Sequence, residues 1–165
     1  MTTTTPPAPT ATRRVPRYGV LMAVIFGICV VMMSVSITAE ILFGYVGTGP
    51  QPRSLVEQLG GVVGFGTGGL VVSLLAARFL GADPARSRVG AIVLAVLAVP
   101  AIAFFWCGLP AMLGATAAYL AGVTGGRTPH AGAPRAFGTV GLVLAILNPV
   151  VNLLAVSLSW LSELI

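Results

Sequence analysis

Nine basic residues, all of them arginine, interrupt long apolar stretches, and this alternation constrains the fold more than any other feature of the chain. The arginines are Arg13, Arg14, Arg17, Arg53, Arg78, Arg86, Arg88, Arg127 and Arg135. A helix that crosses a bilayer needs about 20 apolar residues, and loops that stay in the cytoplasm carry an excess of Lys and Arg. The pattern therefore predicts a multi-pass protein of the bacterial plasma membrane, with the lipid bilayer as its main partner.

Composition excludes several classes of protein. Hydrophobic residues make up 56% of the 165 positions and charged residues 8%, whereas a soluble domain has about 25% charged residues. The net charge of +5 is spread between apolar stretches with few aromatic residues, which argues against a nucleic-acid partner. One His and four acids offer no metal-ligand or catalytic spacing, so we predict no enzyme, no metal and no cofactor.

The uncharged stretch at residues 89–124 decides how many helices there are. As one helix it would be about 54 Å long, against an apolar bilayer thickness of about 30 Å. Trp106, Gly108 and Pro110 mark an interfacial anchor and a turn near its middle. We therefore predict two short helices, with the alternative that one of them is re-entrant.

The chain is then an all-α bundle, with a disordered cytoplasmic tail at residues 1–18 and a transmembrane domain at 19–165. The five expected spans are 19–44, 54–80, 89–106, 109–124 and 137–160. With the N-terminus inside and the C-terminus outside, eight arginines are cytoplasmic and only Arg53 is outside. A four-helix alternative gives a weaker division of six against three.

The second expected span, residues 54–80, carries glycines at four-residue spacing: Gly60, Gly64 and Gly68. Glycines at this spacing let two helices approach closely in a membrane. The ridge predicts either packing within the bundle or a homo-oligomer interface. Gly69, Ser73 and Ala77 form a neighbouring row of small residues.

The last expected span carries a polar stripe. Asn148, Asn152, Ser159 and Glu163 are four, seven and four residues apart, which places them on one helical face. The stripe indicates hydrogen bonding between helices or a polar path through the bundle. Glu40 is the acid expected within the membrane, near the outer end of the first span, and such residues are candidates for function. Together with Glu57, Gln58 and Asn152 it is a candidate polar cluster on the outer side.

The two cysteines are expected to be free thiols. Cys29 lies in the middle of the first span, whereas Cys107 lies at the turn between two later spans. The Cα atoms of a disulfide are within about 7 Å of each other, and the different expected depths of these cysteines argue against such a bond.

Residues 109–155 resemble a small glycine-rich membrane domain of actinobacteria whose function is unknown. The resemblance rests on the sequence LPAMLGATAAYLAG, a short arginine-containing loop, and Arg135, Gly141, Leu142 and Leu144. The chain departs from that pattern at Gly138 and Ala145. The resemblance implies no activity. From the glycine ridge and the lack of catalytic spacing, we expect a non-enzymatic scaffold or accessory subunit, as a homo-oligomer or in a larger membrane complex. The alternative is a small oligomeric transporter or channel with a polar path near Glu40, Asn148 and Asn152.

Overall fold

The computed structural model describes residues 17–42 and 54–162, and every regular element within them is helical. The elements are α1 (Tyr18–Phe26), the π-helical turn η1 (Gly27–Met32), α2 (Met33–Leu42), α3 (Leu55–Leu80), α4 (Pro84–Ala98), the 3₁₀ helix η2 (Pro100–Cys107), α5 (Leu109–Leu120) and α6 (Ala133–Ser162). Most of the expected tail, together with Arg53 and Glu163, lies outside these residues.

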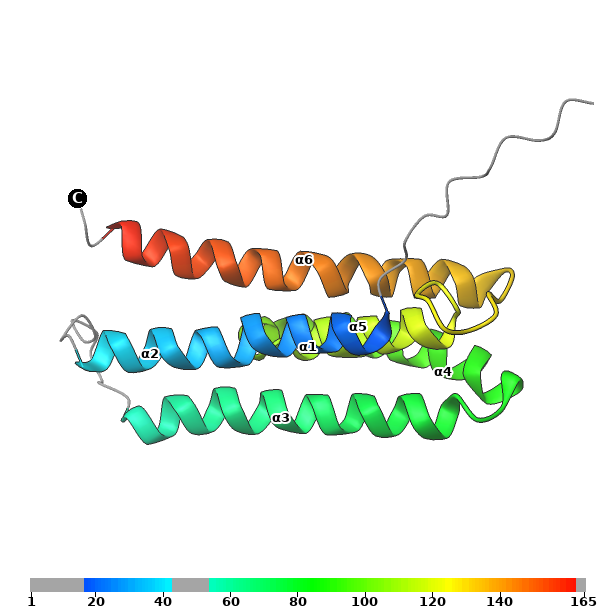
Figure 1. Ribbon diagram of the computed structural model, residues 1–165, viewed down its shortest axis with the longest axis horizontal. Coiled ribbons are helices and arrows are strands. Elements are labelled where there is room, and N and C mark those ends of the chain that lie inside the picture. The colour runs from blue at the N-terminus through cyan, green and yellow to red at the C-terminus, as the bar shows by residue number, and fades with distance from the viewer. Residues whose placement is uncertain (1–16, 43–53, 163–165) are drawn as a thin grey trace, which may run out of the picture.

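Three long helices run side by side (Figure 1). α1, η1 and α2 form one continuous helix, Tyr18–Leu42, and the other two are α3 and the segment Ala133–Leu158 of α6. Each has 25 or 26 residues, or about 38 Å at 1.5 Å per residue, which exceeds the apolar thickness of a bilayer of about 30 Å. The described residues thus contain three helices long and apolar enough to cross a membrane, or four if α4 and η2 count as one span.

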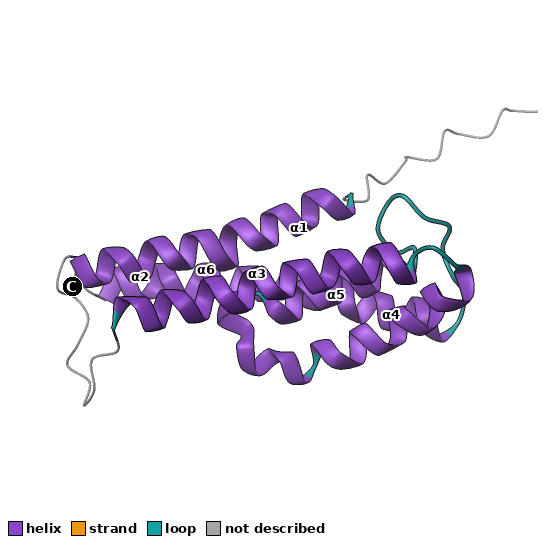
Figure 2. Ribbon diagram, turned by 90° about the horizontal axis from the view of Figure 1, so that it is seen from below, coloured by secondary structure: helices purple, strands orange, loops and turns teal. Residues whose placement is uncertain are grey.

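α4 and α5 form a hairpin that covers only part of the length of the long helices (Figures 1 and 2). η2 bends by 74° away from α4, and the chain then reverses at Gly108. The two arms meet again at their far ends, because Ser87 Oγ near the start of α4 donates a 2.6 Å hydrogen bond to the carbonyl oxygen of Leu120 at the end of α5. At about 22 and 18 Å, α4 and α5 are each shorter than the apolar thickness of a bilayer.

Local sequence explains where the helices begin. Ser54 caps α3, since its Oγ accepts a 3.2 Å hydrogen bond from the backbone N–H of Glu57. Asp83 caps α4 in the same way, and Pro84 occupies the first turn, where its missing N–H costs nothing. Gly108 has a φ of +76°, a left-handed conformation that favours glycine. These three positions fix the ends of the hairpin and of its neighbour α3.

α5 lies at the centre of the bundle. Ten of its twelve residues are buried, and it packs against α1, α3, α4 and α6. A helix that is apolar on every side is suited to such a position, because it has no polar face to present to water. The other helices expose large apolar side chains instead, including Val35, Val93 and Leu154.

The six described arginines gather at one end of the bundle. They are Arg17 before α1, Arg78 in the last turn of α3, Arg86 and Arg88 early in α4, Arg127 in the loop after α5 and Arg135 early in α6. Arg127 joins this loop to the end of α3 through a 2.7 Å hydrogen bond to the carbonyl oxygen of Gly81. We call this the arginine end, and Glu40 and Glu57 lie near the opposite end.

The backbones of α5 and α6 meet directly at Gly114 and Gly141. A Cβ added at Gly141 would lie 2.5 Å from the carbonyl oxygen of Gly114, and one added at Gly114 would clash with the backbone of Gly141. Only the absence of a side chain on both helices allows this approach.

Gly141→Val should therefore destabilise the fold, by about 1–3 kcal/mol as in other overpacked cores. The free energy of unfolding, measured by SDS titration in mixed micelles, checks this. Gly27→Val is the matched control, because a Cβ at Gly27 meets no atom within 4 Å. Equal stability of the two variants would contradict the close contact between Gly114 and Gly141.

Candidate functional site: the tip of the hairpin

The hairpin tip lies halfway along the long helices. Gly108 packs on Cys29, since a Cβ added there would lie 2.6 Å from Cys29 Cβ. On the other side, the carbonyl oxygen of Cys107 lies 3.3 Å from the position of a Cβ on Gly66. Cys29 and Gly66 are both close to the midpoints of their helices, Tyr18–Leu42 and Leu55–Leu80. The turn that leads into α5 is therefore in the middle of the bundle.

Two asparagines of α6 satisfy the backbone at this tip. Asn148 Nδ2 and Asn152 Nδ2 donate hydrogen bonds of 3.1 and 2.9 Å to the carbonyl oxygen of Phe105. Both amides also approach Cys29 Sγ, at 3.5 and 3.7 Å. Phe105 is near the end of η2, and its carbonyl oxygen also accepts a 3.1 Å hydrogen bond from the backbone N–H of Gly108. Asn148 and Asn152 thus connect the hairpin tip to η1 and α6.

One polar atom at the tip has no partner. Asn152 is completely buried, and its Oδ1 makes no hydrogen bond within the described structure. Its Nδ2 also donates a 3.0 Å hydrogen bond to the carbonyl oxygen of Asn148, one turn earlier. A buried acceptor without a donor is costly in a membrane.

The two cysteines come closer together than the sequence suggested. The sequence placed the Cys107 turn at the membrane surface, whereas the structure places it beside Cys29 in the middle of the bundle. Both cysteines are buried and free. Cys107 Sγ donates a 3.1 Å hydrogen bond to the carbonyl oxygen of Phe104. The prediction that Cys29 and Cys107 lie at different depths was wrong, because the hairpin turns halfway along the long helices.

Glu40 does not share hydrogen bonds with the asparagines in the described residues. Its Oε1 accepts a 3.3 Å hydrogen bond from Ser36 Oγ, one turn earlier on α2. Glu57 is exposed at the start of α3. The structure thus connects Asn148 and Asn152 to each other through Phe105, and the described hydrogen bonds do not extend this network to Glu40 or Glu57.

A second polar group, missed by the sequence analysis, lies nearer the arginine end. The hydroxyl of Tyr18 lies 3.1 Å from Thr116 Oγ1 and 3.3 Å from the carbonyl oxygen of Ser73. The Tyr18 ring stacks on Tyr119 at 4.5 Å, and Arg127 lies over the Tyr119 ring. His130 Nε2 lies 3.4 Å from Ser87 Oγ. These contacts join α1, α3 and the connecting loops to the hairpin.

The predicted glycine ridge faces away from the bundle. Gly60, Gly64 and Gly68 are exposed, and a Cβ added at each would meet no atom within 4 Å. The residues of α3 that are buried against the bundle are Val62, Gly66, Gly69, Ser73 and Ala77. At 3.6 residues per turn, the two rows lie on roughly opposite sides of the helix. Within this chain the neighbouring small-residue row packs inward and the ridge itself stays open.

Comparisons with known proteins give no information on function, so any function must be inferred from the residues of this chain. No family model matches the chain, and no curated protein or solved structure matches it. The resemblance to a small actinobacterial membrane domain stays an expectation.

The two asparagines share one acceptor, and this makes a double-mutant test informative. Asn148→Leu or Asn152→Leu alone leaves the other amide on the Phe105 carbonyl, so each should cost only about 0.6–1.7 kcal/mol. The double variant should lose more than the sum, by about 0.5 kcal/mol or more, because the carbonyl then keeps only the backbone N–H of Gly108 as a donor.

The free energies of unfolding of the four proteins in mixed micelles give this coupling energy. Leu147→Ala, on the exposed side of α6, controls for a general loss of apolar area. Strictly additive losses would show that the two amides act independently.

Proposed function

We propose that the chain is an integral protein of the bacterial plasma membrane and acts as a non-enzymatic scaffold or accessory subunit. In this proposal α3 offers its glycine ridge to a second copy or to a larger membrane protein. The observation that carries it is the open face at Gly60, Gly64 and Gly68. A ridge already covered by the chain's own helices would have no such role.

The proposed topology has three complete spans and one re-entrant hairpin. The helix Tyr18–Leu42, α3 and α6 cross the membrane, and α4, η2 and α5 enter and leave on the side of the arginine end. This keeps the orientation that the arginines favour, because a re-entrant hairpin and a pair of full spans both return the chain to the same side. The N-terminus is then cytoplasmic and the C-terminus is outside.

Physical constraints support a re-entrant hairpin. Backbone that is not helical is tolerated at membrane depth only where protein covers it or where it lines a cavity. Phe104 departs from helical geometry, with φ −111° and ψ 32°, and the next carbonyl is held by Asn148 and Asn152. The non-helical step is thus accompanied by the polar partners that a position inside a bilayer demands.

Close packing explains why an open glycine ridge favours a protein partner over lipid. Lipid tails are as apolar as leucine side chains, so helices associate in membranes through close van der Waals contact. A row of glycines presents a groove into which a partner helix fits, and it exposes backbone for weak Cα–H hydrogen bonds.

Gly64→Leu should remove this association without unfolding the chain, since the added side chain meets open space. In membranes, Thr67→Cys places an exposed thiol beside the ridge, where oxidation should yield a cross-linked adduct. We expect Gly64→Leu to reduce the adduct about tenfold, equivalent to about 1.4 kcal/mol, measured by non-reducing gel and mass spectrometry.

Gly27→Leu is the control, since it makes the same change at another open glycine. The mass of the adduct tells a second copy from a different membrane protein. The scaffold proposal fails if no adduct forms, or if Gly64→Leu and Gly27→Leu give the same yield as the parent.

The second candidate is a small oligomeric transporter or channel with a polar path near Glu40, Asn148 and Asn152. The unpartnered Oδ1 of Asn152 at the hairpin tip favours it, because polar groups near the membrane midplane often mark transport sites. Flux of an ion or solute into liposomes that Asn152→Leu abolishes and Gly64→Leu preserves would select this function over the scaffold.

A further inference from the structure

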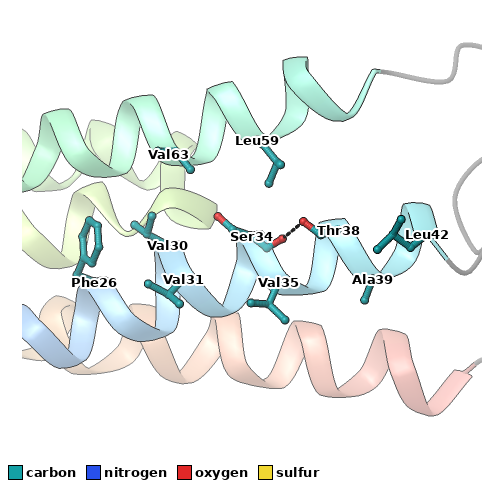
Figure 3. A pocket seen from close by; sticks show the side chains of 10 residues that line it. All are labelled: Phe26, Val30, Val31, Ser34, Val35, Thr38, Ala39, Leu42, Leu59 and Val63. Carbon is teal, nitrogen blue, oxygen red and sulfur yellow. Dashed lines mark hydrogen bonds between the residues drawn. The ribbon is translucent and has the colours of Figure 1, made fainter.

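A long open groove lies between α2 and α3 in the half of the bundle away from the arginines (Figure 3). Its floor and one wall come from residues between Phe26 and Leu42 on the first long helix, and its other wall from Leu59 and Val63 of α3. Residues 26–42 cover about 24 Å along the helix axis. The groove therefore runs in the direction in which lipid tails lie.

The lining of the groove is almost entirely apolar. Two of its ten lining residues carry hydroxyl groups, Ser34 and Thr38. Thr38 Oγ1 donates a 2.8 Å hydrogen bond to the carbonyl oxygen of Ser34 on its own helix (Figure 3). Ser34 Oγ has no hydrogen-bond partner within the described residues, but it is buried and adds no polar surface to the groove. The surface presented by the remaining residues is hydrocarbon, which selects an apolar occupant.

The volume of the groove matches that of a lipid tail better than that of a helix. It is about 630 Å³. A methylene group fills roughly the volume of a water molecule in the liquid, so a 16-carbon chain occupies about 480 Å³. A helix of the same length is a cylinder about 10 Å across, with a volume of about 1,900 Å³. One acyl chain fits within the groove, whereas a helix would leave most of its volume outside.

We propose that this α2–α3 groove binds one acyl chain of a phospholipid from the leaflet opposite the arginine end. The inference rests on the proposed membrane insertion. Transfer of a chain from bulk lipid into the groove gains no hydrophobic free energy. Binding comes from simultaneous contact with two helices, which the surface of a single helix does not provide. The bound chain should therefore exchange more slowly than lipid around the rest of the bundle.

The test uses a phospholipid with a photoreactive diazirine on its acyl chain, reconstituted with the full chain in nanodiscs. Labelled residues are mapped by mass spectrometry. We expect labelling at Val35 and Val63 to exceed, several-fold, that at Val93 and Val96 of α4, which are exposed apolar residues of the same type.

Val35→Trp fills the groove from an exposed position and should abolish the excess labelling at Val63 while leaving Val93 unchanged. Native mass spectrometry should show one phospholipid retained by the parent and none by this variant. Labelling of Val63 at or below the level of Val93, or equal lipid retention by both proteins, would overturn the proposal. Val93 labelling reports membrane insertion by itself, so a failure of the groove is distinguishable from a failure of the proposed topology.

Discussion

Helix α5 can occupy the centre of the bundle only because the backbone leading into it is supplied with hydrogen-bond partners. The chain must reverse at Gly108 among apolar helices, and each unpaired carbonyl there would cost several kcal/mol in a membrane. At the tip, the carbonyl oxygen of Phe105 accepts hydrogen bonds from the backbone N–H of Gly108 and from the amides of Asn148 and Asn152. Gly108 meets the steric demand, since a side chain would strike Cys29. Burial of α5, and with it the packing of the other helices, depends on these contacts.

Small residues serve two different purposes in this bundle. Gly114 and Gly141 bring α5 and α6 together, and Gly66 and Gly69 bring α3 against the hairpin. Gly60, Gly64 and Gly68 face outward on the same α3 helix. One side of α3 thus holds the protein's own centre, while the other is free for association. This division is what connects the fold to the proposed scaffold role.

Sequence patterns predicted the long helices because a long apolar stretch is a local signal. They also predicted a turn near Gly108, because this glycine and the nearby Pro110 are a local turn signal. The depth of that turn depended on non-local contacts with Cys29, Gly66 and the asparagines, which no spacing reveals. The inward row of α3 was equally hidden, since two glycine-containing rows of similar composition lie on one helix and only packing distinguishes them. The Tyr18, Ser73 and Thr116 group joins residues far apart in the sequence.

The most direct test of this account is the depth of the hairpin tip in a bilayer. A nitroxide on Ala103→Cys, an exposed position in η2, reports depth through its relative collisions with oxygen and a water-soluble nickel chelate, and Val56→Cys near the start of α3 supplies a reference near the surface. The native cysteines are buried, and the unsubstituted chain gives the background. We predict that the label at position 103 lies near the bilayer centre, far deeper than the label at position 56. Equal, shallow depths would place the turn at the opposite membrane surface and contradict the re-entrant hairpin.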